Sequence, residues 1–144
     1  TVKLTVVSGT LEKDDAYPIF ITGVRGYDNS YSEIVAYRTV IDLKENVPPN
    51  VKSVTLTDTT TIVITFDDYI KGNPSFNVFQ NSATVNLSTS NPYYISGDTI
   101  TIYLSSSILN PTSVTVIPRA DCSIEDENGN KSTLGPGTVL SVTE

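Results

Sequence analysis

The chain has no histidine, methionine or tryptophan among its 144 residues, and its single cysteine is Cys122. Without histidine, a Ser-His-Asp triad, a Cys-His pair and a histidine-ligated zinc site are all excluded. One cysteine cannot form a disulfide within the chain, in contrast to many small secreted domains. We expect Cys122 to pack as a small hydrophobic residue. The sequence therefore predicts a protein that is not an enzyme.

Positive charge is also scarce, with 9 Lys and Arg residues against 16 Asp and Glu residues and a net charge of −7. An acidic surface repels nucleic acid phosphates and anionic lipid headgroups. No apolar run approaches the roughly 18–20 residues that a membrane-spanning helix needs. We therefore expect no nucleic acid partner and no direct membrane insertion, whereas a cation remains a compatible ligand.

Alternation of apolar and polar residues dominates the chain. In Thr61–Asp67, Ile62, Ile64 and Phe66 share one face, which is the period-two pattern of a half-buried strand. Turn residues recur about every 8–12 positions, a spacing typical of a sandwich of short strands. Strands are expected at Val2–Val6, Tyr17–Val24, Glu33–Leu43, Val51–Thr57, Thr61–Asp67, Ser75–Phe79, Ala83–Leu87, Tyr93–Ile95, Thr99–Leu104, Ser113–Ile117 and Thr138–Val142. Phe20 and Val24 are expected in the core, and Ser107–Leu109 can hold one helical turn.

A stiff joint at Pro48-Pro49 leads directly into two of these strands and indicates a module boundary. The segments that begin at Leu11 and Leu109, 98 positions apart, share a strand, an Asp/Asn-rich turn near Asp28 or Asp126, and a closing strand. We therefore predict an all-β fold: an Ig-like antiparallel β-sandwich at 48–144, preceded at 1–47 by the C-terminal part of another module.

The N-terminal part would then lack partner strands and expose an apolar face and an edge. Three alternatives stay open. Another chain supplies the missing strands, the segment packs on its neighbouring module, or one larger domain uses all 144 residues.

Four motifs occur in order along the chain: Pro49-x-Val51-x-Ser53-Val54, Ile62-x-Ile64-Thr65-Phe66, Gly97-x-Thr99-Ile100-Thr101-Ile102 and Asp126-x-x-Gly129-Asn130. Together they resemble the bacterial Ig-like modules of S-layer and other large cell-surface proteins. The first segment departs from the pattern, because Asp28-Asn29-Ser30 lacks the glycine. The resemblance implies an Ig-like sandwich with a scaffold or adhesive role in the cell envelope, and it implies no particular ligand.

Side-chain oxygens at Asp126, Asn128 and Asn130 alternate along a glycine-containing turn. Such spacing resembles the opening of a calcium loop, since Ca²⁺ takes six to eight oxygen ligands. The alternative is a solvated hairpin turn, in which Asp, Asn and Gly supply only the turn geometry.

Two further acidic positions are weaker candidates for calcium. Asp67 and Asp68 follow a core strand, where a charged strand end that protects an edge is the alternative. Glu45 lies in the joint, where calcium would stiffen a rod and a plain proline-stiffened linker is the alternative. Tyr93 and Tyr94 are adjacent and point to opposite faces, so one belongs to the core and one to the surface.

We therefore expect a structural module of a secreted bacterial cell-surface or S-layer protein that builds a stiff rod or lattice, with calcium assisting. Its partners would be neighbouring modules and other copies of the protein. The alternative is an adhesion or carbohydrate-binding accessory module of a secreted multidomain protein, for which exposed coplanar aromatic side chains are the discriminating feature.

Overall fold

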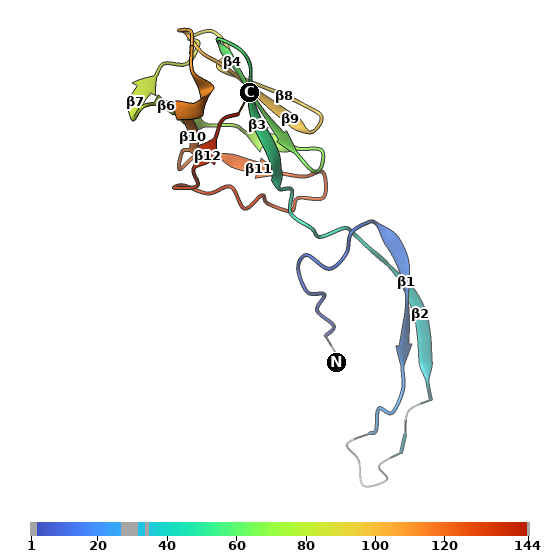
Figure 1. Ribbon diagram of the computed structural model, residues 1–144. Coiled ribbons are helices and arrows are strands. Elements are labelled where there is room, and N and C mark those ends of the chain that lie inside the picture. Colours follow the sequence, from blue (N-terminus) through green and yellow to red (C-terminus); the bar gives the residue numbers. More distant parts are fainter. Residues whose placement is uncertain (1–2, 27–31, 34, 144) are drawn as a thin grey trace. The chain divides into compact units, whose positions relative to one another are not determined.

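The computed structural model describes residues 3–26, 32–33 and 35–143. The chain divides into two compact units, Thr1–Val47 and Pro48–Glu144, which are described separately (Figure 1). Among the described residues, the regular structure is antiparallel β-sheet and a single 3-10 turn, η1 (Pro111–Ser113). No helix in the part of the chain that the structure describes is long and apolar enough to cross a membrane.

The first unit is built around a β-hairpin. Strands β1 (Asp15–Ile21) and β2 (Tyr37–Leu43) run antiparallel, in a register that pairs Tyr17 with Ile41 and Ile19 with Thr39. These side chains share one half-buried face. Asn46 closes the base of the hairpin, because its Oδ1 accepts from the backbone N–H groups of Thr10 and Leu11 at 3.0 and 2.9 Å.

Two expectations for this unit are wrong. Lys3–Val6, the described part of the first expected strand, forms no strand, and Leu4 is 62% exposed. Phe20 lies on the outer face of β1, 56% exposed, with the Arg38 guanidinium 4.6 Å from its ring centre. The alternation therefore identified the strand correctly, but two strands alone offer no second layer to bury Phe20. The turn at Asp28-Asn29-Ser30 lies outside the described residues.

The second unit is a sandwich of two four-stranded sheets (Figure 1). One sheet has the order β3-β4-β9-β8, from β3 (Val51–Asp58), β4 (Thr61–Phe66), β9 (Thr99–Tyr103) and β8 (Tyr93–Ser96). The other has the order β12-β10-β6-β7, from β12 (Leu140–Ser141), β10 (Val114–Pro118), β6 (Phe76–Gln80) and β7 (Ala83–Val85). A short pair, β5 (Lys71–Asn73) with β11 (Ser123–Glu125), completes it.

The core lies between these sheets and is aliphatic with two phenylalanines. Ile62, Ile64 and Phe66 of β4 are fully buried, as the alternation predicts. Burial of each such side chain contributes roughly 1.5–3 kcal/mol to folding. The remaining core residues are Val54, Ile70, Phe76, Val78, Ile100, Ile102, Leu104, Ile108, Val114, Val116, Ile124 and Val142. The predicted Ig-like sandwich is therefore confirmed for this unit.

The secondary-structure expectations for this unit fail at three places. The helical turn lies at Pro111–Ser113 and not at Ser107–Leu109, because Asn110 caps it with its side chain and Pro111 starts it. Strand β5 lies where the sequence predicts a loop, and β11 lies where it predicts no strand, since neither carries a long alternating run. Gly72 of β5 has φ +125°, and its neighbour across the pair is the β11 backbone.

Tyr93 links the two sheets. Its hydroxyl accepts from the Phe76 backbone N–H at 2.8 Å and donates to the Phe76 carbonyl at 2.9 Å. Strand β7 pairs only with Val78–Gln80. The Tyr93 hydroxyl therefore supplies hydrogen-bond partners to the Phe76 backbone, which β7 does not reach. Burial raises the pKa of Tyr93, with backbone hydrogen bonding acting in the opposite direction. Tyr94 is 59% exposed, so of the two neighbouring tyrosines Tyr93 belongs to the core and Tyr94 to the surface.

Candidate functional site

The Asp126 turn is built around a buried carboxylate. Asp126 is only 1% exposed, and it lies just after β11. Its Oδ1 accepts from the Asn130 backbone N–H at 2.8 Å, and its Oδ2 accepts from the Asn130 side-chain amide at 2.7 Å. Gly129 takes φ +89°, which lets the backbone turn within this short loop. Asn128 is exposed in the same turn.

The Asp67-Asp68 pair lies where β4 has ended, so the two side chains do not alternate across a sheet. Asp67 is held at the base of β3, because its Oδ1 accepts from the Asn50 backbone N–H at 2.7 Å. Asp68 accepts from the Tyr69 backbone N–H at 2.7 Å. Both carboxylates therefore hold the backbone where the strand ends.

Asp98 joins this pair from another part of the sequence. The Gly97-Asp98 turn accepts two backbone hydrogen bonds, from Phe66 to Asp98 at 2.8 Å and from Ile70 to Gly97 at 2.9 Å. These contacts place Asp98 beside Asp67 and Asp68, where together with Tyr69 they line a depression of about 240 Å³. Asp98 was not among the sequence candidates. The sequence shows that Asp98 lies in a tight turn with Gly97, but it does not show that this turn lies next to the Asp67-Asp68 loop.

Asp68 and Asp126 are the candidates that the fold of the second unit brings together. A carboxylate oxygen of Asp68 lies within 4.8 Å of one from Asp126. Two carboxylates so close repel one another, and a buried carboxylate is normally paired with a cation or bound to a metal. The oxygen donors are of the hard type that Ca²⁺ prefers. The arrangement can therefore accept a calcium ion, with Asn130 orienting Asp126.

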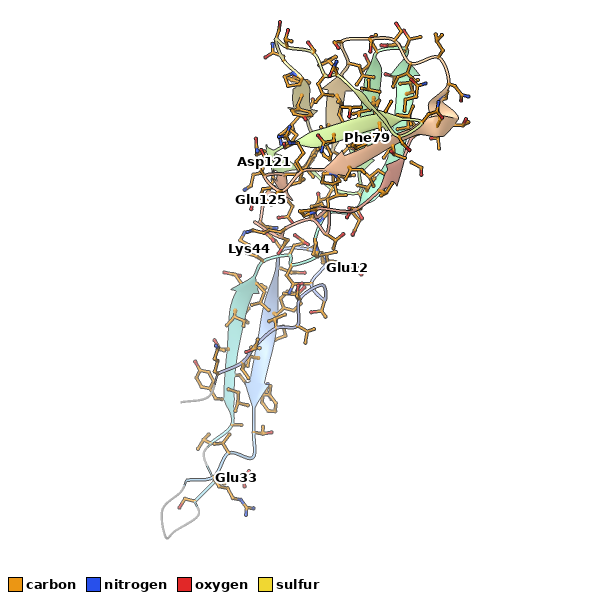
Figure 2. The ribbon with its side chains drawn as sticks, turned by 90° about the vertical axis from the view of Figure 1, so that its left-hand side faces the viewer. Glu12, Glu33, Lys44, Phe79, Asp121 and Glu125 are labelled. Atoms are coloured by element: carbon orange, nitrogen blue, oxygen red, sulfur yellow. The ribbon has the colours of Figure 1, made fainter. Side chains whose placement is uncertain are left out.

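Lys71 of β5 places a positive charge beside the Asp126 turn. Its Nζ lies 3.7 Å from Glu125 Oε1 and donates to the Glu127 carbonyl at 3.2 Å. Glu125, on β11, is labelled in Figure 2. Lys71 therefore contacts the residues on either side of Asp126, Glu125 and Glu127, at the edge of the turn.

Glu45 belongs to the first unit. Its Oε1 accepts from the Val47 backbone N–H, and the side chain is half-buried. In the same unit Asp14 accepts from the Glu45 backbone N–H at 2.7 Å and from Lys44 Nζ at 2.5 Å. The side-chain contact raises the pKa of Lys44. These bonds fix the backbone that leads to the joint.

Cys122 is the one sulfur nucleophile of the chain. It is half-buried and packs against the core, and burial raises the pKa of its thiol. A raised pKa lowers the fraction of reactive thiolate at neutral pH. The residue thus has the properties of a packing residue rather than those of a catalytic nucleophile.

The sheets, the core and the late Asp-Gly-Asn turn are those of a bacterial Ig-like domain, and the family description "Bacterial Ig-like domain" matches residues 38–143. The chain belongs to this family, which confirms the resemblance seen in the four motifs. The match begins within β2, ten residues before Pro48. No curated protein matches the chain.

Among solved structures, the chain is similar to the crystal structure of the S-layer protein rSbsC(31-844). The identity is 19%, the TM-score is 0.48, and the alignment covers 69% of this chain. It covers 14% of the S-layer protein, so the chain corresponds to a small part of that protein's length.

Proposed function

We propose that the chain is a non-enzymatic structural module of a bacterial cell-surface or S-layer protein. It would act outside the cell and build a stiff rod or lattice through contacts between modules. The observation that carries the proposal is membership of the bacterial Ig-like family over residues 38–143. The closed aliphatic core of the second unit supports the proposal, because a close-packed core makes the unit rigid.

The bridge between β3 and Thr143, which follows β12, suits a module that carries tension. Thr143 lies beside β3 and runs parallel to it, in a bridge with Thr55. Thr143 N–H donates to the Val54 carbonyl and Leu56 N–H donates to the Thr143 carbonyl, both at 2.9 Å. When parallel neighbours are pulled from opposite ends, these bonds are loaded together in shear. Separation then requires both bonds to break at once.

The end of the chain also ties this clamp to the other sheet. Val142 N–H donates to the Val114 carbonyl at 3.1 Å, and the Val142 side chain is buried in the core. The segment Val142-Thr143 therefore bonds to both sheets, to β10 on one side and to β3 on the other. We define the bonds between β3 and Thr143 as the terminal clamp.

The hairpin of the first unit supports contacts between copies. Two strands are marginally stable alone, and three or more with an apolar face are needed for independent stability. Phe20 and Val40, exposed by 56% and 61%, are the large apolar side chains on its outer face. Pro18 removes a backbone donor from β1, whereas β2 has no proline. We propose that a strand of another copy or a neighbouring module adds at the β2 edge.

Calcium would assist by joining acidic loops. In the second unit, Asp68 and Asp126 would supply carboxylate oxygens, and a bound ion would remove their mutual repulsion. Replacing one of these carboxylates would lower the affinity without emptying the core, since both lie in loops. The expected consequence is a calcium-dependent melting temperature.

Single-molecule force spectroscopy tests the mechanical proposal. The full chain is pulled from its two ends, with the second unit expected to unfold in one step at a defined force. The matched comparison pulls the same chain between a cysteine introduced at Asn81 and the C-terminus, which bypasses β3. A lower unfolding force in that geometry supports the clamp, and equal forces in the two geometries contradict it.

The calcium proposal is tested by melting the protein in excess EDTA and in millimolar Ca²⁺. The wild-type chain should melt higher with calcium, and Asp126→Asn should abolish the difference. Mg²⁺ provides a control, because it demands a stricter octahedral geometry. An unchanged melting temperature in EDTA and calcium would show that no structural calcium site exists.

A further inference from the structure

The outer face of the β3-β4-β9-β8 sheet carries a row of hydroxyl groups and two tyrosines. Residues directly opposite in neighbouring strands point to the same side of a sheet. The register places Tyr94 opposite Thr101, and Tyr103 opposite Thr61. The inner positions of the same strands hold the buried isoleucines, so these residues face away from the core. We call Tyr94, Tyr103, Thr61, Thr65, Thr99 and Thr101 the tyrosine–threonine face.

The two tyrosines are close enough to act together. Tyr103 lies two residues beyond Thr101 on β9, while Tyr94 lies directly opposite Thr101 on β8. Diagonal neighbours of this kind have Cα atoms about 7–8 Å apart, which is within reach of aromatic side chains. Tyr94 is 59% exposed and Tyr103 is 38% exposed. The face therefore presents two neighbouring aromatic rings to a ligand.

Hydroxyl groups continue from the tyrosines across the sheet. Thr99 lies opposite Thr65, and Ser53 of β3 lies opposite Thr65 on the other side. Each threonine hydroxyl can donate one hydrogen bond and accept two. These hydroxyl groups surround Val63, which lies opposite Thr101 on the same face, so the surface matches a ligand that carries both hydroxyl groups and apolar patches.

The centre of the face is uncharged, although the protein is acidic. The chain has a net charge of −7, yet none of the outward positions of β4, β9 and β8 carries an ionised side chain at neutral pH. Asp58 of β3 lies directly opposite Thr61 and is therefore on the same side, at one end of the face, while Lys52 lies at the irregularity between Val51 and Ser53. An anionic polymer finds no cation among the outward positions of β4, β9 and β8, and a basic peptide finds only Asp58, at one end of the face. The charge pattern therefore favours a neutral partner.

A neutral partner with hydroxyl groups and apolar ring faces is a polysaccharide. Its sugar rings have C–H groups that pack on aromatic rings, and its hydroxyl groups exchange hydrogen bonds with serine and threonine. Tyrosine is enriched among the residues that dominate protein interfaces, but threonine and serine are under-represented there, so the threonine-rich part of the face matches a protein partner less well. We propose that the tyrosine–threonine face binds an uncharged polysaccharide, with Tyr94 and Tyr103 stacking on sugar rings. This binding is additional to the load-bearing role and does not depend on it.

The experiment measures retention of the full chain by polysaccharides. Insoluble cellulose and chitin are used in depletion assays, and xylan, hydroxyethylcellulose and dextran are used in affinity electrophoresis. Polygalacturonate is the anionic control. We expect retention by at least one uncharged polymer and none by polygalacturonate. Failure of all the uncharged polymers to retain the chain overturns the proposal.

Variants place the binding on the face. Tyr94→Ala with Tyr103→Ala should weaken retention at least about tenfold, the effect of losing dominant contacts. Tyr94→Phe should retain binding, because the ring remains. Tyr37→Ala is the matched control, since Tyr37 is 58% exposed and lies in the first unit. An equal loss in the Tyr37 variant, or none in the double variant, contradicts the proposal.

Two further measurements distinguish saccharide binding from misfolding and from pairing of copies. Circular dichroism checks that each variant is folded, and Tyr94→Ser replaces the double variant if that protein unfolds. Analytical ultracentrifugation detects pairing between copies. If the chain self-associates through Tyr94 and no polymer retains it, the face is an interface between copies and the saccharide proposal is wrong.

Discussion

The Tyr93 hydroxyl offers a clean test of how the two sheets are held together. Tyr93→Phe removes one oxygen and keeps the ring, which packs edge-on against Phe76 with ring centres 6.0 Å apart. The change leaves the Phe76 N–H and carbonyl without the partners that lie at 2.8 and 2.9 Å. Phe76 is fully buried, so little water can replace the lost bonds.

The magnitude follows from two unsatisfied backbone groups. A buried polar group that loses its partner costs about 1–3 kcal/mol, and removal of the hydroxyl's own desolvation offsets part of this. We expect a loss of about 2–3 kcal/mol in the free energy of unfolding, which corresponds to roughly 10–20 °C in melting temperature for a unit of this size.

Urea denaturation followed by circular dichroism measures the free energy of unfolding of both proteins. Tyr94→Phe is the control, because Tyr94 is exposed and should tolerate the change within about 0.5 kcal/mol. A Tyr93→Phe protein as stable as the wild type would refute the reasoning, since the hydroxyl would then contribute nothing to the link between sheets.

The same hydroxyl predicts an alkaline transition. Burial raises the pKa of Tyr93 above its ordinary value near 10, because the charged form is poorly solvated. Its contribution to stability is fully present below the unfolded pKa and is lost as pH rises through the higher folded pKa. Wild-type stability should therefore fall above about pH 10 more steeply than that of Tyr93→Phe.

Three other predictions concern the backbone and the turns. In Gly72→Ala, the new Cβ would lie 2.1 Å from the Ser123 carbonyl oxygen at φ +125°, so separation of β5 from β11 should cost about 1–3 kcal/mol or more in urea denaturation; unchanged stability would contradict the geometry. Thr143→Pro removes the N–H that donates to Val54 and should lower the unfolding force of the chain pulled by its ends, with Thr138→Pro, outside the terminal clamp, as the comparison. The hydrogen bond from the Thr60 backbone N–H lowers the pKa of Asp58. Ionised Asp58 therefore stabilises the hairpin above the unfolded Asp pKa, and this contribution is lost as pH falls. In Asp58→Asn, the free energy of unfolding should depend less on pH below about pH 4 than it does in the wild type.

The long inner strands of the second unit were predictable because each buries one side of a strict alternation. Ile62, Ile64 and Phe66 identify β4 from sequence alone, and Ile100 and Ile102 identify β9. Strand β5 was not predictable, since Lys71-Gly72-Asn73 is exposed throughout and its pairing depends on a glycine that admits the β11 backbone. Phe20 was misplaced for a related reason, because periodicity shows which residues share a face but not whether a second layer covers it.

The candidate site was predictable only in part. The Asp126 turn could be recognised from oxygens spaced two residues apart, and Asp126 and Asn130 are hydrogen-bonded to one another. Its proximity to Asp68 could not be recognised, since more than fifty residues separate them and only the packed sheets bring their carboxylates within 4.8 Å. Whether calcium binds there stays a prediction, as does the assignment of residues 1–47 to a preceding module.

The terminal clamp also determines which parts of the second unit are free to change. Tension that enters at β3 and leaves at Thr143 does not pass through the connections between the inner strands until the clamp separates. Longer loops at those connections cost only about 0.6 kcal/mol for each doubling of length. Under the proposed mechanical role, insertions in these loops would therefore leave the bonds of the terminal clamp, and the unfolding force that they determine, unchanged.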